Sequence, residues 1–454
     1  MEQLLQRTSL YLTAAFCVIP GLAQGQPTIG GPINVDITAG EAEGLSVIPS
    51  GQMVAVSSPV LIPGIPEEAF TSSITVLLHV DVPTPKFKEL FTVDLGAGEV
   101  TDVAYADHSG FLIANMREDD LHLENKLVLI RGSTVVQSIP LGAPADGLSL
   151  TKSGRFLVLA VEKGEEIQVY EVRSSGLSLA AVVNRAAMEP YFVGEEGRLA
   201  ADIEPEAVAF TPDDAVALVT LQEQSSVVFI DLQKVSAELA AAASTGRGPE
   251  EIGALALANI VHLPFGFQNS QGVPAGVEPD GLDVSPDGSF AIVANEASNQ
   301  ARHLGGISIL DLRGGVAEIP EPVTLCIFDV DPSLLDGSGF TSCPLPGPGG
   351  SLPAGHSRLP RLDPNGTAIF DRGGRTVCAV NIERPPRDED RGSVLFLDVT
   401  GILNGVFPTV LTRRNVGLNP GARPEGLKTS NHDDFLWVAL NSDLGTFARF
   451  EIGD

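Results

Sequence analysis

A short unit of apolar strands and Asp-Gly turns recurs along this chain, and the recurrence limits what it can fold into. The clearest copy covers residues 278–312 and begins with an acidic head, Pro279-Asp-Gly-Leu282. A short alternating strand, a Ser-Pro-Asp-Gly turn, an apolar strand ending in Asn and a third alternating strand follow. Period-two alternation predicts strands, and Pro-Asp-Gly supplies the residues of a tight turn. The unit is therefore a set of antiparallel strands.

Seven copies of this unit follow one another in the sequence. Six have recognisable heads, and a weaker copy runs through residues 369–398. Their first strands include Leu45, Val103, Leu148, Val208, Leu282, Ile369 and Leu427. The shortest spacing, the 45 residues from Val103 to Leu148, is close to one four-stranded propeller blade. The sequence thus predicts an all-β fold: one seven-bladed β-propeller domain over residues 33–454.

The two ends of the repeat array are expected to meet in one sheet. The last copy supplies three strands, whereas residues 33–37 alternate in the same way before the first head. An unsealed propeller leaves the edges of its first and last blades open. We therefore predict that this N-terminal strand becomes the outermost strand of the final blade.

Two insertions interrupt the repeats. Residues 233–262 contain two helix-favouring runs and predict a small helical insertion, while residues 318–361 form a long loop rich in Pro and Gly. A Cys326–Cys343 disulfide would close a short stretch of that loop, and whether it forms stays open. Cys378 lies in an apolar strand and is expected to be a buried hydrophobic residue.

The first 23 residues have the features of an export signal. A positive start and an apolar run are followed by small residues at 21–23, and cleavage is expected there. No later stretch reaches the roughly 20 apolar residues that span a bilayer. The product is therefore expected to be secreted or periplasmic, without a membrane span.

The charge balance excludes one class of partner. The net charge is −30, from 58 acidic and 28 basic residues, and such a field repels nucleic acid. A monomer that binds an unknown protein or a small polar ligand is expected. The acids either keep the surface soluble or, in part, bind a hard cation.

One set of polar residues is expected to meet at a mouth of the central channel. In a propeller the first strand of each blade lines the channel and the second runs back. The residue before the first strand and the residue after the second therefore share a face. The head position holds Glu43, Asp102, Asp146, Glu206, Asp280 and Glu425, and the second position holds Asn115, Glu162, Gln222, Asn295, Asn381 and Asn441.

This ring has two interpretations. Oxygen ligands of this kind suit Ca²⁺, and the predicted ligands are Glu43, Asp146, Glu206, Asp280, Asn295, Asn441 and Glu425. In the structural interpretation, the acids accept backbone N–H bonds in turns and the asparagines end strands by bonding backbone groups. Both could hold in different blades. Asn365-Gly-Thr367 is in addition a glycosylation sequon, relevant only to a eukaryotic secretory route.

The fourth repeat, residues 196–232, resembles the hallmark segment of the choice-of-anchor I proteins. These are surface or secreted bacterial propellers related to the mesenchyme-specific cell-surface glycoprotein group. The Asp-Gly turn followed by Ile-Val-Ala-Asn is similar to YVTN and lactonase-like propellers, and the Pro-Glu-Gly-Leu head resembles phytase-like propellers. The resemblance implies a propeller and an exported location, and it implies no agreed activity.

Two functions remain open on the sequence. The first is a binding or scaffold protein, because no nucleophile–base motif stands out. The alternative is a Ca²⁺-dependent hydrolase of phosphate esters or lactones, in which a ring carboxylate acts as general base. Its candidate catalytic residues are Glu206, Asp280 and Glu425.

Overall fold

The computed structural model describes most of the repeat region. The described residues are 27–29, 33–36, 45–48, 53–61, 70–80, 86–117, 125–200, 202–268, 274–296, 305–327, 340–342, 364–382, 392–416, 423–429, 435–441 and 446–453. The predicted export signal, residues 1–23, lies outside them. So do Cys343 of the predicted disulfide and Glu43 of the predicted ring.

Antiparallel sheets make up most of the described chain: five four-stranded sheets, two five-stranded sheets and one two-stranded pair. The all-β prediction is therefore confirmed. Sheet 1 consists of β3 Leu45–Ile48, β4 Met53–Leu61, β5 Phe70–Val80 and β6 Lys86–Ala97, and sheet 2 of β7 Glu99–Ala106, β8 Phe111–Arg117, β9 Lys126–Arg131 and β10 Thr134–Pro140. Sheet 3 consists of β11 Leu148–Leu150, β12 Phe156–Val161, β13 Glu166–Arg173 and β14 Gly176–Asn184, and sheet 4 of β15 Pro205–Phe210, β16 Val216–Leu221, β17 Ser226–Asp231 and β18 Leu257–His262.

The remaining strands follow the same order along the chain. Sheet 5 consists of β21 Glu278–Val284, β22 Phe290–Glu296, β23 Gly306–Asp311, β24 Val323–Ile327 and β25 Phe340–Ser342. Sheet 6 consists of β26 Pro364–Arg372, β27 Arg375–Ile382, β28 Ser393–Asp398 and β29 Thr409–Asn415. Sheet 7 consists of β30 Arg423–Thr429, β31 Phe435–Asn441 and β32 Thr446–Gly453, together with β1 Thr28–Ile29 and β2 Ile33–Asp36 from the start of the chain. A separate pair joins β19 Phe265–Gln268 to β20 Pro274–Gly276.

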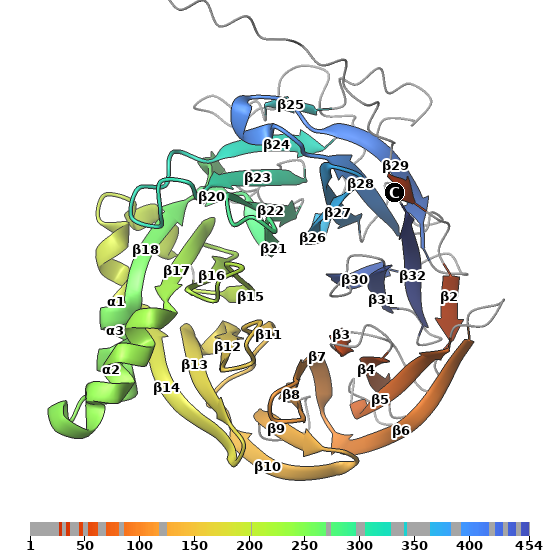
Figure 1. Cartoon of the computed structure of the whole chain (residues 1–454). Helices are drawn as coiled ribbons and strands as arrows, with labels where there is room; N and C mark the ends of the chain where they lie inside the picture. The colour runs from red at the N-terminus through yellow and green to blue at the C-terminus, as the bar shows by residue number, and fades with distance from the viewer. Residues whose placement is uncertain are drawn as a thin grey trace, which may run out of the picture.

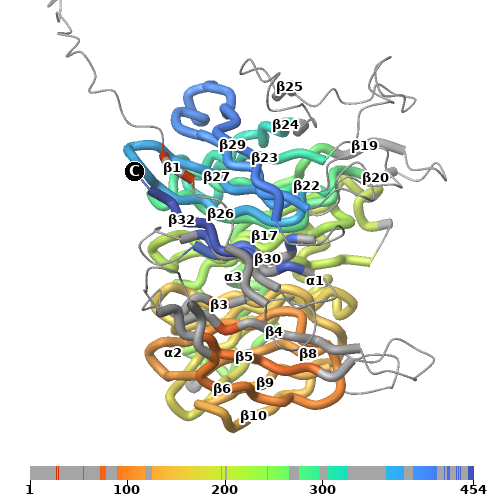
Figure 2. Tube along the Cα trace, turned by 90° about the vertical axis from the view of Figure 1, so that its right-hand side faces the viewer, coloured from red at the N-terminus to blue at the C-terminus, as the bar shows by residue number. Residues whose placement is uncertain are grey.

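The sheets are arranged like propeller blades around a centre, with their first strands innermost (Figure 1). Each innermost strand contacts the next, in the order β3, β7, β11, β15, β21, β26 and β30, and β30 also contacts β3. At the other end of the chain, β1 and β2 both pair antiparallel with β32. Figures 1 and 2 both place β1 beside the C-terminal end of β32.

The apolar core lies between neighbouring sheets. One cluster joins Phe111 and Leu129 of sheet 2 to Leu157 and Val172 of sheet 3, and similar clusters join each other pair of successive sheets from sheet 1 to sheet 7. Because a middle strand is covered on both faces, it is apolar throughout; all six residues of β12 are buried. By contrast, the outermost strand β10 is mostly exposed.

Short polar side chains on the innermost strands join one sheet to the next. The Asp283 carboxylate accepts the N–H of Val284 at 2.8 Å and the N–H of Ile369 in sheet 6 at 2.7 Å. Ser46 Oγ likewise accepts the N–H of Tyr105 in sheet 2 at 3.0 Å. These bonds satisfy innermost backbone groups that have no partner on that side within their own sheet.

Few helices interrupt the sheets: α1 Arg185–Met188, α2 Leu232–Thr245 and α3 Pro249–Ala256, with 3-10 turns η1 Glu162–Gly164, η2 Glu189–Phe192, η3 Glu196–Ala200 and η6 Ile402–Asn404. Asp231 caps α2 by accepting the N–H of Lys234 at 2.8 Å, and α3 packs against β14. The predicted helical insertion at 233–262 is thus helical only to Ala256, because its last six residues form β18. No helix among the described residues is long and apolar enough to cross a bilayer.

The second predicted insertion, residues 318–361, includes two strands of sheet 5. β24 pairs with β23, and β25 pairs with β24. Residues 328–339 and 343–361 lie outside the described part. The predicted burial of Cys378 is confirmed: the side chain is fully buried, and burial raises the pKa of its thiol well above the usual value.

Candidate functional site: the axial cavity

A cavity of about 310 Å³ lies where the innermost strands meet. Its lining comes from six sheets, from sheet 2 at Thr101 to sheet 7 at Leu427 and Lys428. Four of the predicted ring carboxylates lie on it together: Asp102, Asp146, Glu206 and Asp280. The repeat therefore brings acids that are far apart in sequence to one site.

Backbone register explains why the heads reach this cavity. In sheet 4, Pro205 pairs with Leu221 and Val208 with Val219, so two head residues oppose the single residue Thr220. The same irregularity recurs in sheets 5, 6 and 7. A bulge of this kind bends the strand and redirects the extra side chain. It fixes Glu206, Asp280 and Asn365 at the cavity.

The register also identifies two head residues that were not recognised from the repeats in the sequence. In sheet 2 the equivalent of Glu206 is Thr101 rather than Asp102, because the irregularity falls between Val100 and Asp102. In sheet 6 it is Asn365, for which no equivalent was assigned. The order Pro-Asn-Gly matches Pro-Asp-Gly and Pro-Glu-Gly, so a proline-led pattern would have found it. Asn365 lines the cavity, and Thr367 of the sequon is buried.

The side chains opposite the bulges join neighbouring heads. Asn115 is fully buried; its Oδ1 accepts the N–H of Asp102 at 2.9 Å, and its Nδ2 donates to the Ala145 carbonyl of sheet 3 at 2.8 Å. Asn381 makes the same two contacts with Gly366 and with Pro424 of sheet 7. These contacts favour the structural interpretation of the two asparagines.

In sheet 4 a threonine side chain joins the neighbouring heads. Thr220 Oγ1 accepts the N–H of Ala207 at 2.9 Å and donates to the Asp280 carbonyl of sheet 5 at 2.8 Å. The sequence pattern predicted Gln222, two residues further on, as the polar residue after the second strand of this repeat. The register corrects it to Thr220.

One predicted amide ligand, Asn295, does not line the cavity in the described structure. Asn295 pairs in register with Pro279, one residue beyond the bulge, and is almost fully buried. Its Nδ2 donates to Ser308 Oγ of its own sheet at 2.9 Å, so its prediction as a metal ligand is not supported. Asn441 belongs to β31 and Glu425 to β30, and both side chains lie outside the described residues, as does Glu43.

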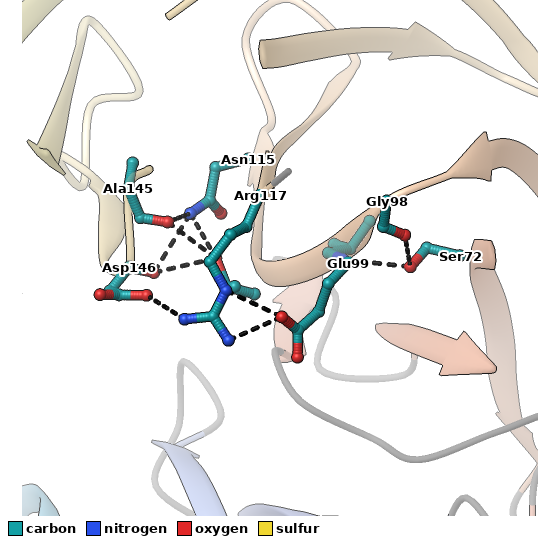
Figure 3. A network of polar contacts seen from close by, with 9 residues as sticks. Ser72, Gly98, Glu99, Asn115, Arg117, Ala145 and Asp146 are labelled. Atoms are coloured by element: carbon teal, nitrogen blue, oxygen red, sulfur yellow. Dashed lines mark hydrogen bonds and ion pairs between the residues drawn. The ribbon is translucent and has the colours of Figure 1, made fainter. Parts of the chain in front are cut away.

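An arginine partly neutralises the acids on one side. Arg117 Nε and Nη2 contact Glu99 Oε2 at 2.8 and 2.6 Å, and Nη1 contacts Asp146 Oδ1 at 3.1 Å (Figure 3). The same network includes the Asn115 contact with the Ala145 carbonyl. The guanidinium group of Arg117 therefore contacts one carboxylate along one edge and a second carboxylate at its other end.

The cavity nevertheless holds more acidic than basic groups. Burial, followed by repulsion from Asp146 and Glu162, raises the pKa of Glu206 to about 9. Burial and a hydrogen bond to Glu162 raise the pKa of Asp146 to about 7. Burial also raises the pKa of Asp102 to about 6, although Lys428 opposes that rise. A positive charge placed among these groups would be stabilised.

Glu206 differs from its neighbours in having no partner. Among the described residues it makes no hydrogen bond and no ion pair, whereas Asp146 has Arg117 and Asp102 accepts two backbone N–H groups. A partly buried carboxylate without a partner is costly. Such a group at a cavity wall is a candidate contact for a ligand.

The arrangement of the described acids bears on the predicted Ca²⁺ site. Within the part of the chain that the structure describes, no three carboxylate, histidine or cysteine side chains lie close enough together to hold a metal ion. The described acids share the cavity but do not converge on one point. They do not fit direct Ca²⁺ coordination, and we derive no step through a bound metal.

Removing the Asn115 amide is expected to destabilise the fold. Asn115→Leu leaves the Asp102 N–H and the Ala145 carbonyl without this partner, which should lower the free energy of unfolding by ~2–4 kcal/mol. Urea titration of the variant measures the loss. Asn404→Leu, at an exposed asparagine, serves as the control. Equal stability of the two variants would contradict the inter-sheet role of Asn115.

Comparison of the chain with models of known protein families gives no match, and comparison with curated proteins gives none either. The resemblance to the choice-of-anchor I proteins therefore stays a prediction. The cavity is the feature of the described structure that bears on function.

Proposed function

We propose that the chain is a closed seven-bladed propeller that is exported and acts as a binding protein. The contact of β30 with β3 and the pairing of β2 with β32 support closure. The apolar run before residue 23 supports export.

We further propose that the axial cavity binds a small organic cation. Glu206 carries this proposal, because it is a partly buried carboxylate at the cavity wall without a hydrogen-bond or ion-pair partner among the described residues. A cavity of about 310 Å³ falls at the lower end of the range for small-molecule sites. Carboxylates spread around such a space suit an ammonium group better than a compact, directly coordinated metal ion.

The cavity lining gives no specific support to the hydrolase alternative. That alternative needs a bound Ca²⁺ beside a carboxylate base, and the described residues include no group of three ligand side chains that could hold the ion. A small-ligand binding role therefore has more support from the geometry than a reaction does.

Calorimetric titration with choline and with cadaverine at pH 8 tests the proposed function. Both cations should bind, and Glu206→Gln should weaken binding at least tenfold, because the neutral amide cannot offset the ligand charge. Glu318→Gln, at an exposed acid outside the cavity, should bind as the native protein does. Melting curves with Ca²⁺ and with EDTA form a parallel arm. If EDTA abolishes the binding of choline and cadaverine, the proposal of an organic cation would give way to a Ca²⁺-dependent site.

A further inference from the structure

Lys428 is a second charged group of the cavity without a contact partner. It lies on β30 of sheet 7, its side chain is exposed, and it lines the same cavity as Glu206. Among the described residues its side chain makes no hydrogen bond and no ion pair. Its positive charge reaches Asp102 electrostatically, but Asp102 already bonds the N–H groups of Val103 and Leu148.

The two unpartnered charges come from opposite parts of the ring. Glu206 lies on β15 and Lys428 on β30, and Figure 1 shows these strands across the centre from each other. The other cationic group of the lining, Arg117, is held by Glu99 and Asp146. The cavity thus offers one carboxylate and one ammonium group for pairing, on separate walls.

We propose that the ligand of this cavity is a small zwitterion, with its ammonium group toward Glu206 and its carboxylate toward Lys428. This inference rests on the proposed function, and it adds an anionic group to the ligand. A simple cation would leave Lys428 unpaired beside it and would meet repulsion from that ammonium group. A zwitterion pairs both groups: its ammonium group favours release of the Glu206 proton, and its carboxylate meets the Lys428 ammonium group.

Two matched pairs of probes separate this inference from the proposed function. Glycine betaine and choline share a trimethylammonium group, and lysine and cadaverine share a chain with amines; in each pair the first molecule adds a carboxylate. Calorimetric titration at pH 8 should show each carboxylate-bearing probe binding at least tenfold more tightly than its partner.

A Lys428→Met variant tests the assigned residue. It should weaken betaine and lysine at least tenfold and leave choline and cadaverine as tight or tighter. Lys152→Met, at an exposed lysine away from the cavity, is the matched control, and melting curves check that both variants fold. Equal binding within each pair, or an unchanged ratio in Lys428→Met, would overturn the zwitterion. If none of the four probes binds the native protein, the proposed function itself fails.

Discussion

Gly147→Ala is expected to lower the free energy of unfolding by about 3 kcal/mol or more. A Cβ atom at Gly147 would lie 2.0 Å from the backbone carbonyl oxygen of Glu206 in the next sheet. No side-chain rotation can relieve a clash with backbone, so sheets 3 and 4 would have to move apart along their shared core. Equilibrium unfolding in urea measures the loss.

The matched control for this substitution is Gly142→Ala. A Cβ atom at Gly142 meets no heavy atom within 4 Å, and its backbone does not need glycine. We expect its stability to change by less than ~0.5 kcal/mol. If both alanine variants unfold at the same urea concentration, the heads are not in the tight contact described for Gly147 and Glu206.

The protein without ligand is expected to lose stability as the pH rises from 5 to 9. The pKa of Glu206 is raised to about 9 and that of Asp146 to about 7 in the folded state. In this window the unfolded chain has released these protons while the folded protein keeps them, so the unfolded state is favoured by higher pH. The total loss should be on the order of 1–3 kcal/mol, because both side chains are partly exposed.

Melting curves across this pH range check the expectation, and Glu206→Gln isolates its main source. The amide cannot ionise, so the variant should show a flatter pH dependence and a higher melting temperature than the native protein at pH 8. Asp287→Asn is the control, because that carboxylate has a lowered pKa and already lies outside the cavity. A native melting temperature that rises between pH 6 and 8 would contradict the proposed electrostatics.

The sequence predicted the fold class well, because alternation and turn residues are local signals. The first three strands of sheet 5 follow directly from residues 278–312, whereas β24 and β25 lie in the segment that was predicted to be a loop. The axial position of Asp146, Glu206 and Asp280 also followed, since it depends only on where each head begins. What failed was placement to within one residue, as with Asp102 and Asn295. A bulge adds a residue to one strand, and a single sequence does not show where it falls.

The absence of partners for Glu206 and Lys428 could not be predicted from the sequence. Every head acid looks alike there, whereas their surroundings differ: Asp146 meets Arg117, which comes from the end of β8 in another sheet. Such differences arise from long-range packing. The boundaries of the helical insertion failed for a similar reason, because only pairing with β17 shows that residues 257–262 are a strand.

Three of the side-chain donors opposite the head bulges point the same way around the molecule. Asn115 of sheet 2 reaches forward to sheet 3, Thr220 of sheet 4 to sheet 5, and Asn381 of sheet 6 to sheet 7. Sheets 2, 4 and 6 therefore each carry a donor placed for the sheet that follows. Deleting the repeat after any of these three would bring a different head against its donor, so the order of the copies is as much a part of the fold as their number.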